Sequence, residues 1–505
     1  MAKKSTRVLS FILSALLLVT MLPVVSLAEE AKYYTFDEAA ATKPYYDKLD
    51  FTALVGPANE ELTNVFVINK AWKYKQGQEP ENVKFVFRGE TVTETYNASR
   101  HMSLLAEVQK YITDNGIKNP VIILTEGVYA ETFKIANGFT ILGPKAGMNP
   151  NVPDADPTKE WALSSNRRIP TESNTYGEAV FRVEGGLAGD HVISGASNSV
   201  GTQNYIVDGV VFQGNGSGVA DESDTGSGTR NWYVQNCIFD DCHSIEGRGN
   251  YSGLAFDRRS SQTYYKNLYV SNSYITNQNT KALYSGHATS INFNGISMQN
   301  SRYPIAYNIG CMQWQGQTTV VTNSHFWNAK GATRENGKTA GIYFNLNWSN
   351  YCNSGSGTDD APFIGTFRNN SFYHMNTADA PLFQVSVAGN TKVAIEENIF
   401  ISEENKAARP AVDIKYLTVD GKVTHEGIGN FSSGAVDGEE SAVGNYKLTN
   451  EQVMIRNNTF VGSEFQALPS IGTNLHDETA LELLGNLYLD NMGSKDGKVI
   501  DPYVE

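Results

Sequence analysis

The residues of this chain whose types could perform chemistry together lie just after two short apolar stretches. Asp257, Arg258 and Arg259 follow one such stretch, and His287 follows the next. A carboxylate and an imidazole can exchange a proton, and an arginine can hold the carboxylate of an acidic sugar with two hydrogen bonds. These four residues are therefore predicted to be catalytic. The alternative is a solvated salt-bridge cluster at a strand end.

The apolar stretches belong to a family of short strands that is predicted to stack into one sheet. Large residues at alternate positions are expected to face inward, so the residues between them face outward. The outward positions predicted to bind a substrate are Asn308, Tyr343 and Asn345. Trp348 is added because an aromatic ring can stack on a sugar, although packing inside the protein is the alternative. The family reads GLAFD (253–257), ALYSG (282–286), PIAYN (304–308), GIYFN (341–345), PLFQV (381–385) and PAVDI (410–414).

Glycoside hydrolysis would need two carboxylates that flank the scissile bond. Asp257 and Asp413 cannot be this pair, because about five stacked coils, roughly 24 Å, would separate them. The adjacent Asp240 and Asp241 resemble the paired aspartates of polygalacturonases. The Asn-Thr-Asp phrase of that family is absent here, so we interpret the two residues as a turn.

A repeat between residues 205 and 491 must position these groups. The repeated phrase is an apolar strand, an Asn or Gly, and a second short strand that closes on Phe or a substitute. A recurring unit near 23–28 residues, with longer copies, is typical of a solenoid with inserted loops. The closing residues are Phe212, Phe239, Ile275, Met298, Phe326, Phe372, Phe400, Phe460 and Tyr488.

The position three residues before each closing residue is predicted to form a tight corner. Gly and Asn tolerate a left-handed backbone at low cost, and eight of the nine copies have one of them. One coil cannot bury its own apolar face, so neighbouring coils must stack and pair their strands. The fold is therefore predicted to be an all-β, parallel β-helix. The corner residues are Gly209, Asn236, Asn272, Gly295, Asn323, Asn369, Glu397, Asn457 and Gly485.

A resemblance to a known family begins at the first coils. The phrases PVIILTEGVYAETFKI (120–135) and FTILGPKAGMNPN (139–151), after a predicted helix, resemble the N-terminal coils of the pectin lyase-like superfamily. The resemblance covers about residues 95–495. It implies a right-handed β-helix, with a substrate cleft along the sheet of GLAFD-type strands. Gly127, Tyr129 and Glu131 are also similar to the opening of pectin methylesterases, but the later catalytic phrases of that family are absent.

The chain is predicted to divide into four parts. Residues 1–28 are predicted to be a secretory signal, with Lys3, Lys4 and Arg7 before an apolar run and small residues at the cleavage point. Residues 29–97 form a lead-in. Residues 98–495 form the β-helix, whose open end is covered by a helix at about 99–114. Residues 496–505 are a C-terminal tail.

Charge and cysteine content limit the possible partners. Removal of the signal leaves 37 basic and 54 acidic residues, a net charge of −17, which repels nucleic acid and anionic membranes. We expect a monomer. The four cysteines, Cys237, Cys242, Cys311 and Cys352, are too few for a disulfide framework, but one or two bonds are compatible with an oxidising compartment.

Five loops are predicted where the repeat is interrupted. They lie near 146–178, 214–231, 243–265, 328–362 and 402–450. Loops on a rigid scaffold often carry binding sites. The loop at 214–231 contains Asp221, Glu222 and Asp224, so calcium is a possible cofactor, because this cation prefers oxygen ligands.

The sequence therefore predicts a secreted, extracellular protein that binds or cleaves polysaccharide, as a lyase or hydrolase of uronate-type glycans if it is an enzyme. The alternative is a non-catalytic surface or adhesive β-helix that serves as a rigid spacer.

The first prediction concerns the signal. When the full-length gene is expressed in a secreting host, the protein in the medium should begin at Glu29, as read by N-terminal sequencing. Recovery of the chain only in the membrane fraction, with residues 1–28 still attached, would contradict the predicted cleavage.

Overall fold

The computed structural model describes the chain in segments that all belong to one compact unit, Phe36–Glu505. The predicted signal, in the other unit, Met1–Thr35, is outside the described residues. The described residues are 64–70, 82–87, 90–95, 101–152, 163–183, 191–195, 199–215, 217–221, 226–243, 252–256, 264–276, 281–285, 290–299, 306–310, 318–328, 342–348, 364–374, 383–387, 392–402, 409–410, 412–416, 418–419, 422–423, 453–461, 465–466, 470–471, 481–489, 494–495 and 498–499.

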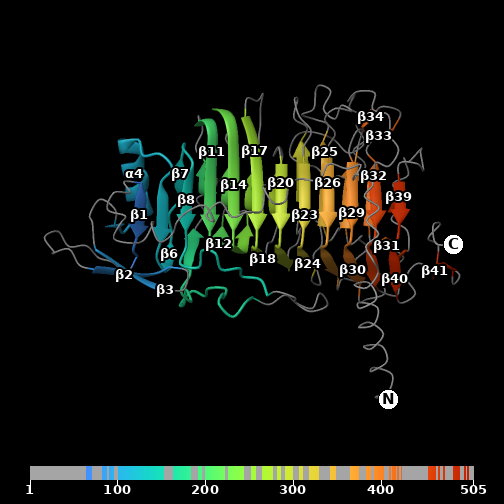
Figure 1. Ribbon diagram of the computed structural model, residues 1–505, viewed down its shortest axis with the longest axis horizontal. Coiled ribbons are helices and arrows are strands. Elements are labelled where there is room, and N and C mark those ends of the chain that lie inside the picture. The colour runs from blue at the N-terminus through green and yellow to red at the C-terminus, as the bar shows by residue number, and fades with distance from the viewer. Residues whose placement is uncertain are drawn as a thin grey trace, which may run out of the picture. The chain divides into compact units, whose positions relative to one another are not determined.

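Stacked parallel strands form three walls, so the chain is a parallel β-helix, as the repeat predicts (Figure 1). The first wall is a 13-stranded sheet. From one end to the other it consists of β4 (His101–Met102), β1 (Val65–Ile68), β5 (Val121–Leu124), β8 (Phe139–Leu142), β11 (Ser199–Asp208), β14 (Gly226–Gln235), β17 (Tyr264–Ser271), β20 (Ser290–Asn294), β23 (Thr318–Thr322), β26 (Ile364–Arg368), β29 (Lys392–Glu396), β35 (Val453–Arg456) and β39 (Leu481–Leu484).

The second wall is an 11-stranded sheet that follows the first wall around each corner. It consists of β6 (Gly127–Tyr129), β9 (Ala179–Val183), β12 (Val210–Asn215), β15 (Ile238–His243), β18 (Tyr274–Thr276), β21 (Ser297–Gln299), β24 (His325–Asn328), β27 (Ser371–His374), β30 (Ile399–Ser402), β36 (Thr459–Val461) and β40 (Leu487–Leu489). Its strands are also parallel, and each pairs with the matching strand of the next coil.

The third wall consists of two five-stranded sheets, whereas the sequence predicted one continuous sheet. The N-terminal sheet contains β7 (Phe133–Ile135), β10 (His191–Gly195), β13 (Ser217–Asp221), β16 (Ser252–Phe256) and β19 (Lys281–Ser285). The C-terminal sheet contains β22 (Ala306–Gly310), β25 (Ile342–Trp348), β28 (Phe383–Val387), β32 (Val412–Tyr416) and β38 (Ser470–Ile471). In the described residues, the ladder of paired residues is interrupted between β19 and β22.

Short two-stranded pairs lie outside the walls. They are β2 (Asn82–Phe87) with β3 (Glu90–Thr95), β31 (Arg409–Pro410) with β37 (Phe465–Gln466), β33 (Thr418–Val419) with β34 (Lys422–Val423), and β41 (Ser494–Lys495) with β42 (Lys498–Val499).

All nine predicted corner positions have a left-handed backbone. Their φ angles lie between 47° at Asn272 and 69° at Gly209. Glu397, the copy with neither Gly nor Asn, adopts φ 56° like the others. The stacked coils therefore impose this geometry even where the residue type does not favour it.

In the C-terminal coils, the residue after the corner forms a buried ladder that the sequence analysis missed. Asn370, Asn398, Asn458 and Asn486 occupy this position in consecutive coils, and each is 7% exposed or less. The Asn398 Nδ2 donates to the carbonyl of Phe367 at 2.8 Å, and its Oδ1 accepts from the backbone nitrogen of Asn370 at 3.0 Å. Each amide thus satisfies backbone groups at the corner where the strand ladders stop.

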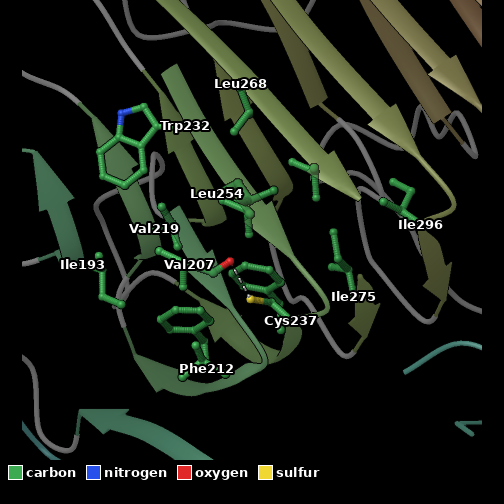
Figure 2. Packing of buried hydrophobic residues seen from close by; sticks show 14 of the residues in the cluster. Ile193, Val207, Phe212, Val219, Trp232, Cys237, Leu254, Leu268, Ile275 and Ile296 are labelled. Carbon is green, nitrogen blue, oxygen red and sulfur yellow. Dashed lines mark hydrogen bonds between the residues drawn. The ribbon is translucent and has the colours of Figure 1, made fainter. Parts of the chain in front are cut away.

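Apolar side chains from all three walls fill the interior (Figure 2). The closing phenylalanines stack from coil to coil, with ring centroids 5.0 Å apart for Phe212 and Phe239 and 4.8 Å apart for Phe372 and Phe400. The repeated closing Phe in the sequence therefore reflects two stacks of rings, which are separated by Ile275 and Met298 at the same position of the intervening coils.

Helix α4 (Leu105–Asn115) lies at the N-terminal end of the core. Leu105, Val108 and Ile112 are buried in the same cluster as β1 and β5. The helix begins six residues later than predicted, because His101–Met102 pairs with β1 as a strand of the first wall. The strand β1 comes from the predicted lead-in and pairs in parallel with β5, so part of that segment extends the β-helix.

Two of the predicted loops are ordered parts of the fold. The segment near 146–178 crosses the corner between the first and second walls. Arg167 of this segment is fully buried, bonds Glu178 at 2.7 Å and donates to the carbonyl of Asn236 at 2.8 Å. Within 214–231, residues 217–221 form β13 and residues from 226 onward belong to β14, so the prediction of a loop there was wrong.

The asparagine ladder can be tested with Asn398→Ala. The substitution removes the acceptor of the Asn370 backbone N–H and the donor to the Phe367 carbonyl, both in the buried ladder. We expect the free energy of unfolding to fall by about 2–4 kcal/mol, measured by urea denaturation.

The control is Asn369→Gly, at the exposed corner position next to the ladder. Glycine accepts the φ of 54° found there, so the change should stay within about 0.5 kcal/mol. Equal losses for the two variants would show that the ladder does not stabilise the coils.

Candidate functional site

The four predicted catalytic residues, Asp257, Arg258, Arg259 and His287, are outside the described residues. The strands that lead to them are described. β16 and β19 pair in parallel, and the last residue of β16, Phe256, aligns with the last residue of β19, Ser285. The backbone therefore places the two strand ends on adjacent coils, as the sequence predicted.

The predicted substrate-binding residues lie on two neighbouring strands of the C-terminal sheet of the third wall. Asn308 of β22 aligns with Asn345 of β25, and Tyr343 aligns with Ala306. Trp348, which was expected in a loop, is the last residue of β25 and aligns with Gly310 after a register shift. The register thus brings Asn308, Tyr343 and Asn345 together and puts Trp348 at the end of the same strand.

The register also extends the two rows beyond the residues that were predicted. One row contains Asn308, Asn345, Ser386 and Lys415, and the other contains Ala306, Tyr343, Gln384, Asp413 and Ser470. Both rows alternate with the row of Val412, which is 1% exposed and belongs to the core. Of these positions, the sequence analysis missed Gln384, Ser386, Lys415 and Ser470. The same alternation in PLFQV and PAVDI would have found them.

Asp257 is outside the described residues, but the strand before it, β16, and the strand that contains Asp413, β32, are described. The strands of the second wall give the number of coils between the two. β15 comes just before β16 in the chain and β30 comes before β32, and β15 and β30 are five pairing steps apart in the sheet. This spacing, roughly 24 Å, is too large for two carboxylates that act on one bond.

Asp240 and Asp241 lie in β15 on the second wall, not in a turn. Asp240 is 8% exposed, and its carboxylate accepts a hydrogen bond from the Gln213 Nε2 at 2.8 Å. The side-chain oxygen of Gln213 in turn accepts from Arg182 at 2.7 Å. Asp241 has φ 53° and is exposed. The aspartates therefore lie on a different wall from the strands that carry the predicted site.

Asp221 is buried inside the coil, contrary to the expectation of an acidic surface loop. Its side chain is fully buried in β13, at 2.9 Å from Arg230, which is 1% exposed. The indole nitrogen of Trp232 donates to the same carboxylate at 2.9 Å. This carboxylate is engaged by a cation and a donor of the chain itself. Glu222 and Asp224 are outside the described residues.

Among the described residues, no three His, Cys, Asp or Glu side chains are grouped so that they could hold a metal ion. Cys237 and Cys242 are buried, and burial raises the pKa of the Cys237 thiol to about 12, which disfavours the reactive thiolate. Cys311 and Cys352 lie outside the described residues.

Two further groups of interest are buried. Burial raises the pKa of Glu178 above its ordinary value, while the adjacent Arg167 acts in the opposite direction. Trp327 is 9% exposed and stacks on Tyr373 with ring centroids 6.1 Å apart, so it packs within the protein. In the part of the chain that the structure describes, no helix has the length and apolar character needed to cross a membrane.

Comparisons with known proteins add little to this geometry. No protein-family model matches the sequence, and no curated protein matches it. Among solved structures, the chain is similar to the Azotobacter vinelandii mannuronan C-5 epimerase AlgE6 A-module, with a TM-score of 0.25 and 10% sequence identity. The similarity covers 76% of this chain and 94% of that one.

The class of protein follows from the strand pairing itself. Three walls of parallel strands, with a corner between the first and second walls of each coil, define a parallel β-helix protein. Membership of the pectin lyase-like superfamily stays a prediction from the sequence motifs.

The buried pair of Asp221 and Arg230 yields the next prediction. Asp221→Ala should lower the free energy of unfolding by about 3–5 kcal/mol, because it leaves the Arg230 charge buried without its carboxylate. A double variant with Asp221→Leu and Arg230→Met should recover much of that loss. Urea denaturation measures all three proteins.

The control for this prediction is Asp114→Ala, which removes an exposed pair with Lys110 and should cost about 0.5 kcal/mol or less. The measurements are repeated with calcium and with a chelator. If calcium stabilised the parent protein and not Asp221→Ala, Asp221 would be a calcium ligand and the assignment as a core ion pair would be wrong.

Proposed function

We propose that this protein is secreted and acts on extracellular polysaccharide, which binds along the C-terminal sheet of the third wall. The observation that carries the proposal is the pair of rows that runs across β22, β25, β28 and β32. The two rows contain amides, hydroxyls and one tyrosine, with Lys415 and Asp413 as their only charged residues.

A row of this kind suits a polymer better than a compact ligand. Adjacent strands lie about 4.8 Å apart, so a chain that crosses the strands meets a polar residue on every coil. Asparagine and glutamine side chains can both donate to and accept from sugar hydroxyls. Tyr343 and Trp348, on the same strand, supply rings of the type that packs against sugars.

The catalytic part of the proposal concerns the strand ends of β16 and β19. His287 or Asp257 would remove a proton from the carbon next to a sugar carboxylate, and Arg258 or Arg259 would stabilise the negative charge that develops. The glycosidic oxygen would then leave with the electron pair of its bond and take up a proton. The products would be a new reducing end and an unsaturated sugar.

The pairing of Phe256 with Ser285 supports this part, because both proposed groups begin within two residues of that pair. Histidine is suited to the transfer, since its ordinary pKa lies near neutral pH. An arginine binds a planar carboxylate in bidentate fashion, which would also orient the acidic sugar.

The experiment is a screen of soluble glycans with the purified mature protein, read for binding and for new reducing ends or unsaturated products. Asn345→Ala should weaken binding of a bound glycan by about threefold to tenfold, because it removes one or two hydrogen bonds. The double variant Arg258→Ala, His287→Ala should bind an acidic glycan more weakly, because Arg258 no longer holds the carboxylate, and should form no product.

The control for Asn345→Ala is Asn115→Ala on the exposed side of α4, which should bind as the parent does. Binding without any product from the parent would identify a non-catalytic glycan-binding β-helix. No binding to any glycan, or unchanged affinity in Asn345→Ala, would refute the proposed site.

A further inference from the structure

The outer face of the first wall has an unusual set of side chains between β11 and β20. Asn204, Asn231 and Asn267 align in the register, and Ser290 continues the row on β20. Side chains at these positions alternate with Tyr205, Trp232 and Leu268, which are buried in the core. The three asparagines therefore lie on the outward side of the sheet, and all three are half-buried.

The asparagines form a second amide ladder, on the outside of the coil. The Asn231 Nδ2 donates to the Asn204 Oδ1 at 3.0 Å, and the Asn267 Nδ2 donates to the Asn231 Oδ1 at 2.9 Å. The Ser290 hydroxyl donates to the Asn267 Oδ1 at 2.8 Å. An amide nitrogen carries two N–H groups and the ladder uses one of them, so each coil keeps an oriented donor for a ligand.

Two tyrosines lie in the next outward row, beside the amides. Tyr233 and Tyr269 stack on adjacent coils, with ring centroids 4.9 Å apart and planes 17° from parallel. Both are half-buried. Burial raises the pKa of Tyr269, and its hydrogen bond with Ser290 connects the tyrosine row to the amide row. The two rings are thus held in place before any ligand arrives.

The tyrosine row ends at a buried amide. Asn292 aligns with Tyr269, is 1% exposed, and neither its Oδ1 nor its Nδ2 has a hydrogen-bond partner in the structure as described. An amide with no partner for either atom is costly, and most buried polar groups find one. Because both atoms are buried, Asn292 marks the end of the accessible part of the row and offers no contact to a ligand.

The face also offers a broad surface. β11 and β14 pair over ten residues, from Ser199 with Gly226 to Asp208 with Gln235, and β17 continues the pairing over eight. Figure 1 shows these three strands extending beyond β20. Thr202 and Thr229 add hydroxyls next to the amide row. Asp208, at the end of β11, is charged but fully buried beside the corner, where it accepts from the Gly147 backbone nitrogen and the Asn236 Nδ2. The amide, threonine and tyrosine positions of the face carry no charge.

We propose that the face formed by Asn204, Asn231, Asn267, Tyr233 and Tyr269 binds an uncharged oligosaccharide segment, as a site separate from the third wall. The ladder amides meet sugar hydroxyls at intervals of one coil, and the tyrosine pair provides a fixed aromatic edge beside them. The lack of charged groups favours a neutral glycan, because an acidic glycan would find no cation there.

The test measures binding of cellohexaose, laminarihexaose and mannohexaose, with hexagalacturonate as the acidic comparison, to the full mature protein by titration calorimetry. Asn231→Asp places a negative charge in the ladder without a change of shape and removes its donor. It should weaken binding of at least one neutral hexasaccharide by about tenfold. Tyr269→Phe, which removes only the hydroxyl, should weaken it by about threefold.

The matched control is Asn323→Asp. Asn323 belongs to another exposed amide row, in which it bonds Asn294 and Asn369 at 2.7 Å each, and it lies at the corner beyond the face. This variant should bind all four probes as the parent does. Thermal unfolding of each variant shows whether it is folded.

The outcomes separate this site from the one on the third wall. Loss of neutral-glycan binding in Asn231→Asp but not in Asn345→Ala supports the proposal, even if the third wall binds nothing. Three results would overturn it: a parent that binds no neutral hexasaccharide, folded Asn231→Asp and Tyr269→Phe variants with unchanged affinity, or a loss seen only in Asn345→Ala. Self-association of the parent that disappears in Asn231→Asp would assign the face to a second copy of the chain and would also overturn it.

Discussion

The corner between the first and second walls is the constraint on which the rest of the structure depends. There the chain turns sharply, the strand ladders stop, and backbone N–H and C=O groups are left inside the protein. A left-handed residue makes the turn, and a polar side chain, from the next position or from another segment, satisfies the groups that the turn exposes. If either were missing, successive coils could not keep one register, and the inward stack of phenylalanines would not form.

The two halves of the β-helix satisfy this corner in different ways. In the C-terminal coils the ladder of Asn370, Asn398, Asn458 and Asn486 does so from within the repeat. In the N-terminal coils the corresponding positions have smaller or apolar side chains: Val210 offers no hydrogen bond, and the Cys237 thiol donates to the carbonyl of Gln235 at 3.1 Å. There the segment at 143–178 supplies the donors from outside: Arg167 bonds the carbonyl of Asn236, and Asn151 bonds those of Ser273 and Gly295. The buried charge of Arg167 is balanced by Glu178, so its arrangement specifies how the segment docks.

The sequence predicted the coils well because the corner and the alternation of strands are local signals. Gly209 and Asn236 favour the left-handed backbone through their own residue type, whereas Glu397 adopts it only because its neighbours above and below do. The interior was harder to predict. Asp221 was interpreted as part of an acidic loop because Glu222 and Asp224 follow it. Its partner Arg230 lies on a different wall, and no local pattern reveals a pair that forms across the interior of the coil. The candidate site shows the same limit. Alternation aligns residues within strands, such as Asn308 with Asn345, but it says nothing about side chains that follow a strand end.

Long-range electrostatic forces and short-range contacts have different effects on how this protein would bind a glycan. A net charge of −14 over the whole sequence repels acidic polymers at a distance, so attraction between net charges cannot drive association with an acidic glycan. Contact must then depend on hydrogen bonds and aromatic packing, which act only at short range and are weakly affected by salt. The amide and tyrosine rows on the first wall are made of such groups. On the third wall, the two polar rows across β22, β25, β28 and β32 contain two charged residues, Asp413 and Lys415. A fold whose walls repeat one residue type every coil can extend such contacts along a polymer, and each added coil contributes another modest interaction.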